Sequence, residues 1–138
     1  MIFVDTGAFI AIYLEGDQYH SHAFPLWKQL LASGERLYTS NFVLEETITL
    51  ISRRGGYEFA LRKARLLYAS PNLEILRPDR RMELAALDYF HKYADQEVGF
   101  TDCVSFALMH AHRLTRVFCF DRHFDAPGFI RVPLVPLA

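Results

Sequence analysis

Short runs of apolar residues alternate with longer segments of helical periodicity along the whole chain. Continuous apolar runs bounded by polar residues are typical of strands that are buried on both faces of a parallel sheet. The pattern therefore predicts strands at Ile2–Val4, Leu37–Thr39, Leu73–Leu76 and Arg116–Phe120, with a short fifth strand at Ile130–Val135.

The segments between these strands carry the start and stop signals of helices. Pro25 falls in the first turn of one segment and Gly34 comes just after its end, which is the usual placement of both residues. Ser40 or Asn41 can cap the next helix, because a short polar side chain accepts a hydrogen bond from the first turn. The predicted helices cover 21–32, 42–53, 57–69, a segment capped by Asp79 and a segment capped by Thr101, and a further apolar stretch spans Ala8–Leu14.

Strands that alternate with helices predict an α/β fold, with a mainly parallel sheet covered by helices on both faces. No linker, internal repeat or low-complexity stretch divides the 138 residues, so we expect a single domain over 1–138. In folds of this type, ligands bind beyond the carboxyl ends of the strands. The residues that follow each strand are therefore the first place to look for chemistry.

Acidic residues stand at or near several of these strand ends. Asp5 directly follows the first predicted strand and Asp121 directly follows the fourth. Glu46 comes six residues after Ser40, and Asp102 lies in the first turn of a predicted helix. Taken singly, these acids also fit a helix cap, a turn, a favourable helix dipole or a solvated helix face. Two independent apolar strands that both end in Asp favour a shared site.

Carboxylates that converge without basic partners repel one another, so they either take up a proton or bind a cation. No Lys or Arg lies within the segments around Asp5, Glu46 or Asp102. An all-oxygen acidic site suits Mg²⁺ or Mn²⁺. One or two such ions can activate water and stabilise the leaving oxygen in phosphodiester cleavage. The acids thus predict a divalent-metal site for phosphodiester hydrolysis.

Four segments, in order along the chain, resemble the motifs of the PIN-domain ribonucleases. Each motif is weak alone, but the four in this order are specific to the family and cover almost the whole chain. The length and the near-terminal first motif particularly resemble the single-domain VapC-type toxins of toxin–antitoxin systems. The matching segments are Phe3–Phe9, Thr39–Thr47, Phe100–Leu108 and Phe120–Phe124, the last followed by Gly128 and Phe129.

The resemblance implies a three-layer α/β/α sandwich and a Mg²⁺- or Mn²⁺-dependent endoribonuclease. It also implies a cognate antitoxin protein, a homodimer, and tRNA or another structured RNA as the substrate. Carried over residue by residue, the catalytic and metal-binding acids are Asp5, Glu46, Asp102 and Asp121, and the supporting residues are Thr6, Ser40 and Thr101.

One position departs from the family pattern. Thr or Ser often stands two residues before the fourth acid, whereas this chain has Cys119. A thiol is a weaker hydrogen-bonding group than a hydroxyl, which puts the support of Asp121 in doubt.

Charge is unevenly distributed along the chain, although the formal net charge is only −1. Residues 1–46 hold two basic and six acidic residues, whereas residues 47–93 hold nine basic and five acidic residues. The near-neutral total argues against a polybasic binder but is compatible with a local basic face. The candidate phosphate contacts are Arg53, Arg54, Arg62, Lys63, Arg65, Arg77, Arg80 and Arg81, and the predicted substrate-binding residues beside Asp121 are Arg122 and His123.

The chain shows neither a signal-peptide pattern nor an apolar run of about 20 residues, so we expect a cytoplasmic protein without a membrane segment. Cys103 and Cys119 lie in apolar sequence, and buried thiols are the simpler interpretation than a disulfide. Trp27 and the aromatic side chains of 57–68 fit either the core or an interface with an antitoxin or a second copy.

Three other classes of protein compete with a nuclease. Asp5-Thr6-Gly7 reproduces the aspartic-protease signature, but that fold is all-β and needs a second copy. A haloacid-dehalogenase phosphatase needs an Asp at position 7, where this chain has Gly. A PIN fold used only to bind RNA or as a scaffold is the stronger alternative, and the presence of all four acids favours the enzyme over it.

Overall fold

The structure, a computed structural model, describes residues 1–137, which form a sheet of five parallel strands in the order β3-β2-β1-β4-β5. The earliest strand in the sequence is therefore the central strand. The strands are β1 (Ile2–Val4), β2 (Leu37–Ser40), β3 (Leu73–Leu76), β4 (Arg116–Phe118) and β5 (Ile130–Val132).

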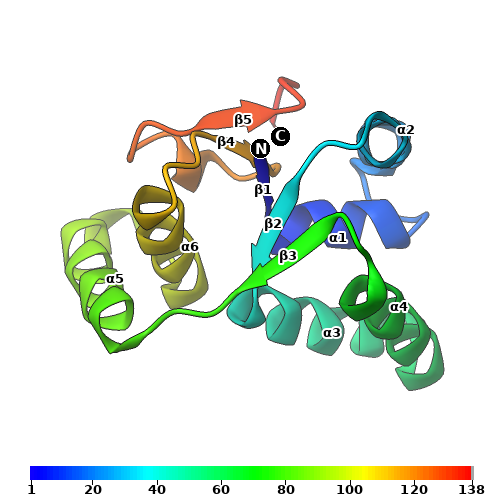
Figure 1. Ribbon diagram of the computed structural model, residues 1–138, viewed down its shortest axis with the longest axis horizontal. Coiled ribbons are helices and arrows are strands. Elements are labelled where there is room, and N and C mark those ends of the chain that lie inside the picture. The colour runs from blue at the N-terminus through cyan, green and yellow to red at the C-terminus, as the bar shows by residue number, and fades with distance from the viewer. Residues whose placement is uncertain (138) are drawn as a thin grey trace.

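Helices cover both faces of the sheet, so the predicted α/β/α arrangement is confirmed. Figure 1 shows α5 and α6 on one side of the sheet and α1, α2 and α4 on the other. The helices are α1 (Thr6–Tyr13), α2 (His20–Ser33), α3 (Asn41–Gly55), α4 (Tyr57–Ala69), α5 (Arg80–Lys92) and α6 (Phe100–Ala111), with 3-10 turns η1 (Ala94–Gln96) and η2 (Arg122–Phe124). No helix within residues 1–137 is long and apolar enough to cross a membrane.

The core lies on both faces of the central strand, which explains why β1 is apolar at every position. Phe3 and Val4 are fully buried, and so are Phe118 on β4 and Phe106 on α6. Trp27 also belongs to this core, where its ring meets Phe9 edge-on at a centroid distance of 5.9 Å. The structure therefore places Trp27 in the core rather than at an interface.

Most of the predicted elements are present, and the differences lie at their ends. The fourth strand ends at Phe118 rather than Phe120, so two residues separate it from Asp121. The fifth strand ends at Val132 because Pro133, which has no N–H group, follows it. Helix α6 is capped by Gly99, which places Thr101 inside the first turn rather than at the cap.

The sheet order creates a switch point beside β1. The chain proceeds from β1 to β2 and β3 on one side, and later returns to place β4 and β5 on the other side. Helices that follow adjacent strands at such a point leave in opposite directions and open a crevice at the carboxyl ends of the strands. Here that crevice lies between β1 and β4, next to Asp5 and Asp121.

Candidate active site

Asp5 directly follows the central strand β1 and is buried in the interior of the protein. Its backbone N–H donates to the Phe118 carbonyl oxygen at 3.1 Å, which continues the pairing of β1 with β4 by one residue. It occupies the N-cap position of α1, yet its side chain caps no helical N–H group. Asp5 is only 3% exposed. Asp5 is thus the N-cap residue by position only, and its carboxylate lines the cleft described below.

Asp121 approaches from the other side of the switch point, at the start of the η2 turn. Its Oδ1 accepts a hydrogen bond from the backbone N–H of His123 at 2.8 Å. The thiol of Cys119 contacts the backbone oxygen of Asp121 at 3.7 Å, not its carboxylate. The Asp121 carboxylate thus obtains its support from the η2 backbone, which answers the doubt that Cys119 raises in the sequence.

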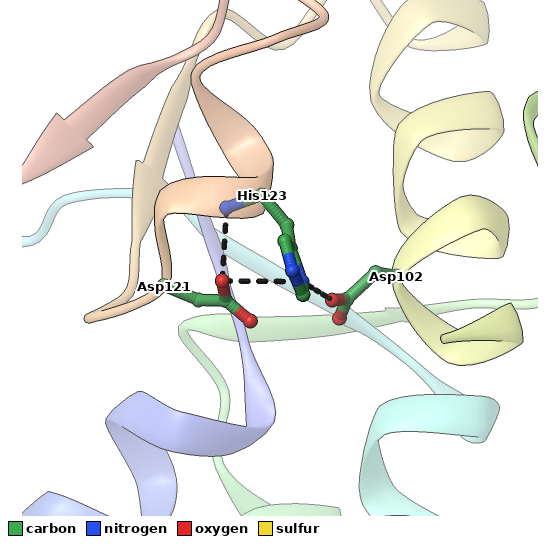
Figure 2. A group of neighbouring side chains, drawn as sticks. All are labelled: Asp102, Asp121 and His123. Atoms are coloured by element: carbon green, nitrogen blue, oxygen red, sulfur yellow. Dashed lines mark hydrogen bonds and ion pairs between the residues drawn. The ribbon is translucent and has the colours of Figure 1, made fainter. Parts of the chain in front are cut away.

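Two helices supply the remaining acids. Asp102 lies in the first turn of α6, and its Oδ2 is 3.3 Å from Nδ1 of His123. Figure 2 shows the side chain of Asp102 reaching from α6 toward Asp121 and His123. Glu46 comes from α3 and is half-buried.

All four predicted acids line one cleft of about 770 Å³. Thr6, Thr101, Arg122 and His123 line the same cleft, whereas Ser40 is not among its lining residues. Ser40 is fully buried, and its hydroxyl oxygen accepts from the Val43 N–H at 3.1 Å. Ser40 therefore caps α3, the helix that carries Glu46, and acts on the site only through that helix.

The negative charges in the cleft act on one another. The pKa of Asp5 lies well above its usual value, first because burial disfavours the charged form and then because Asp102, Asp121 and Glu46 repel it. The nearby backbone N–H of Thr6 partly opposes this rise in the pKa. Burial, followed by repulsion from Asp121 and Glu46, raises the pKa of Asp102 to about 8. The cleft therefore favours the uptake of positive charge, whether as protons or as a cation.

Two buried oxygen atoms at the floor of the cleft have no hydrogen-bond partner within residues 1–137: Oδ1 of Asp5 and the hydroxyl of Thr6. Buried polar atoms usually have a partner, so the unpaired carboxylate oxygen of Asp5 is available to bind a cation. The surrounding donors are carboxylate and hydroxyl oxygens, which divalent cations such as Mg²⁺ prefer. Asp102, Asp121 and His123 also offer ligand atoms that all lie within 4.8 Å of one another. The residues present fit a divalent cation.

Some of the basic residues predicted to contact phosphate lie in the acidic cleft, and others lie away from it. Arg54, at the end of α3, lines the acidic cleft, whereas Arg80 and Arg81 lie at the start of α5 and are not among the lining residues. Arg122 lines the cleft, and its guanidinium donates to the Leu137 carbonyl oxygen at 3.0 Å. Only part of the basic middle segment therefore lies beside the acids.

Two aromatic residues that line the cleft, Tyr19 and Phe120, are not among the site residues predicted from the sequence. The rings of Tyr19 and Phe120 are stacked in parallel at a centroid distance of 4.5 Å, and both residues line the cleft. Phe120 has a sequence signal, since it directly precedes Asp121, but nothing in the segment before α2 singles out Tyr19.

Residues 2–130 match the family model of the PIN domain, so the chain belongs to the PIN-domain family, a family of nucleases. It is similar to the 23S rRNA-specific endonuclease VapC20 of Mycobacterium tuberculosis, with 35% identity over 96% of this chain and 98% of the relative. The crystal structure of that VapC20, a sarcin–ricin loop cleaving toxin, superposes with a TM-score of 0.83 at 33% identity, covering 94% of this chain and 97% of the other. The all-β fold of an aspartic protease is thereby excluded.

More distant structures share the fold. VapBC2 of Rickettsia felis, bound to a DNA fragment of its promoter, matches with a TM-score of 0.70 at 14% identity, over 95% of this chain and 97% of the other. DNA-bound VapBC of Salmonella typhimurium matches with a TM-score of 0.68 at 17% identity, with the same coverage of 95% and 97%. At these identities the likeness extends to the fold alone.

Proposed function

We propose that this protein is a divalent-metal-dependent endoribonuclease and the toxin of a toxin–antitoxin pair. The observation that carries the proposal is the convergence of Asp5, Glu46, Asp102 and Asp121 in one cleft at the sheet's switch point. The unpaired oxygen of Asp5 supports a metal-bound state, because the cation would replace the missing partner. An RNA-binding scaffold would have no need of four repelling acids at its centre.

In the proposed site, the four acids would hold one or two Mg²⁺ or Mn²⁺ ions. Such an ion supplies Lewis-acid activation of water and offsets the charge of the phosphate. The chain's own residues position the ligands: the end of β1 holds Asp5, the start of η2 holds Asp121, and the first turn of α6 holds Asp102. Thr6, with its unpaired hydroxyl on the cleft floor, and Thr101, on the cleft wall, are proposed to support these ligands.

The substrate is proposed to enter the cleft that Arg54, Tyr19 and Phe120 line. Arg54 would contact a phosphate, and the aromatic rings of Tyr19 and Phe120 suit the face of an unstacked base. Arg122 is a further proposed phosphate contact. The 35% identity to a 23S rRNA-specific endonuclease supports ribosomal RNA as the substrate. Cleavage of tRNA is the alternative outcome of the same assay.

The direct test is cleavage of purified 23S rRNA and tRNA by the wild-type protein with Mg²⁺, with Mn²⁺ and with EDTA. Asp5→Asn and Asp102→Asn variants should be inactive, while Asp17→Asn should retain activity because Asp17 lines the same cleft outside the set of four acids. Equal cleavage by all proteins, or cleavage that persists in EDTA, would contradict the proposal.

The toxin role adds a cognate antitoxin, a homodimer and action in the cytoplasm. Two helices expose large apolar side chains that partners of this kind would cover: Tyr57, Leu61, Leu66 and Tyr68 on α4, and Leu84, Leu87 and Phe90 on α5.

Expression of the chain alone should arrest growth, and Asp102→Ala should relieve the arrest. Co-expression with the neighbouring gene product should restore growth, and light scattering should give the mass of a dimer. Harmless expression of the wild type would contradict the toxin role but not the nuclease.

A further inference from the structure

We propose that His123 is a nitrogen ligand of the metal ion, so that the site prefers Mn²⁺ to Mg²⁺. The inference rests on the proposed function, because it assigns one more ligand to the same cleft. It differs from the role in phosphate binding that the sequence suggests, since the imidazole faces the acids.

The position of one ring nitrogen carries the argument. Nδ1 of His123 lies 3.3 Å from Oδ2 of Asp102 and 3.3 Å from Oδ1 of Asp121. Figure 2 shows the ring between the two carboxylates. One N–H group cannot donate well to two oxygens at once, and 3.3 Å exceeds the usual length of such a bond. Adjacent ligands of an octahedral ion with bonds of about 2.1 Å lie about 3 Å apart, which is close to the observed spacing.

A second, independent atom in the same cleft also favours a bound cation. The unpaired Oδ1 of Asp5 is fully buried, and Asp5 lines the same cleft. The ligand atoms that lie within 4.8 Å of one another come from Asp102, Asp121 and His123, and Asp5 lines the same cleft beside this group. The nitrogen and the orphaned oxygen therefore both favour a cation in the cleft, and the group that holds His123 is the one proposed to bind it.

The fold fixes the imidazole in this place. His123 is followed by Phe124, which is fully buried and meets Phe106 of α6 edge-on at a centroid distance of 5.1 Å. Phe106 lies one turn after Asp102 on the same helix. The helix that supplies one acid therefore also anchors the turn that supplies the histidine, and a ligand held by such packing needs little reorganisation to bind.

The nitrogen donor determines which ion the site selects. Carboxylate oxygens suit Mg²⁺ and Mn²⁺ alike, whereas imidazole binds the transition metals in preference to Mg²⁺. Removal of the imidazole should therefore weaken Mn²⁺ binding more than Mg²⁺ binding. Every substitution at His123 except Pro keeps the backbone N–H that supports Asp121, so the ring can be tested alone.

The experiment measures metal binding without RNA, on wild type, His123→Asn and a matched control, His112→Gln. His112 follows α6 at the end opposite to Asp102, about 15 Å away along the helix. Calorimetry gives the affinities for Mn²⁺ and Mg²⁺, and pulsed EPR of bound Mn²⁺ detects coupling to a histidine nitrogen. We expect this coupling in wild type and His112→Gln only, and a Mn²⁺/Mg²⁺ affinity ratio at least about tenfold lower in His123→Asn.

Two results would overturn the inference while leaving the nuclease intact. The first is Mn²⁺ bound to wild type without nitrogen coupling, which would make His123 a positioning residue of the acids. The second is equal loss of affinity for both ions in His123→Asn. Failure of wild type to bind either ion would instead overturn the proposed metal site itself, together with this inference.

Discussion

The cleft has two halves that treat their acids differently. In the inner half, Asp5 and Thr6 are buried and each keeps an oxygen atom without a partner within residues 1–137. In the outer half, Asp121 is partly exposed and its carboxylate accepts a hydrogen bond from the His123 backbone. The Asp121 carboxylate thus has a backbone donor, whereas Oδ1 of Asp5 has none within residues 1–137.

The unpaired oxygens of the inner half lower the stability of the folded chain at a position where a cation could bind. Burying an unpaired carboxylate beside other acids is unfavourable, and the folded chain tolerates it only because the rest of the core is apolar and well packed. Asp121 also repels Asp102, but its carboxylate is more exposed and accepts a backbone hydrogen bond, so its burial costs less. Substitutions at the unpaired inner residues and at residues with partners should therefore have opposite effects on stability and unequal effects on activity.

The largest effect is expected for Asp5→Asn. RNA cleavage should fall by about 10²–10³-fold or more, because a ligand of the ion that offsets phosphate charge is lost. The metal-free variant should be more stable than wild type by about 0.5–2 kcal/mol, because Asn cannot carry the charge that burial and the neighbouring acids disfavour. Cleavage assays and urea unfolding in EDTA measure the two effects. A variant that loses activity and stability together would show that Asp5 is needed for folding.

The second prediction concerns pH. The pKa of Asp102 is about 8 in the metal-free protein, against about 4 in an unfolded chain. Between these values the folded state holds a proton that the unfolded state has released. The stabilisation is therefore fully present below about pH 4 and is lost as pH rises toward 8, by up to about 1.4 kcal/mol per pH unit.

The comparison of wild type with Asp102→Asn isolates this group from the other titrating side chains. Urea unfolding in EDTA at pH 5, 6, 7 and 8 should show wild type losing stability relative to the variant as pH rises. Saturating Mg²⁺ should remove the trend in wild type, because the ion replaces the proton. A difference that is independent of pH would contradict the raised pKa.

Two buried hydroxyls give a matched pair with smaller effects. The Thr6 hydroxyl has no partner within the described chain, whereas the Ser40 hydroxyl accepts from Val43. Ser40→Ala should reduce stability by about 1 kcal/mol through loss of the α3 cap. Thr6→Val should leave metal-free stability unchanged or increase it, yet reduce cleavage about tenfold. If Thr6→Val destabilises as much as Ser40→Ala, the Thr6 hydroxyl has a structural partner after all.

The smallest effect is expected at the rim, for Arg54→Gln. Because Arg54 is exposed and beside the cleft, its loss should weaken RNA binding several-fold and lower the slope of log affinity against log salt by about 1. Arg80→Gln on α5 serves as the control and should change neither quantity. Filter binding across salt concentrations measures both. Equal effects of the two substitutions would indicate diffuse attraction rather than a contact.

Much of this fold could be predicted because each strand is an uninterrupted apolar run that ends at a polar residue. The position of Asp5 at a strand end is predictable for that reason. The end of β4 is not, because Cys119 and Phe120 continue the apolar run beyond the last strand residue. The contact of His123 with Asp102 is not predictable either, because it joins η2 to α6 and a local sequence pattern does not indicate which elements pack together.

The same holds for Ser40 and Thr101, which the family resemblance assigns alike to the support of the acids. Their roles separate only in three dimensions, since Ser40 caps α3 and Thr101 lines the cleft. The stack of Tyr19 on Phe120 also depends on tertiary packing, which brings the segment before α2 against the end of β4.

The central position of β1 also sets the order in which the site can be assembled during folding. Pairing of β1 with β2 closes a modest loop, whereas pairing with β4 brings together segments from nearly opposite ends of the described chain. Closure of the longer loop carries the larger entropic penalty and is expected later. A partly folded chain can thus present Asp5 and Glu46 without Asp121. Binding of a divalent ion would then report when the last long-range contact has formed, which makes the metal a probe of folding as well as of catalysis.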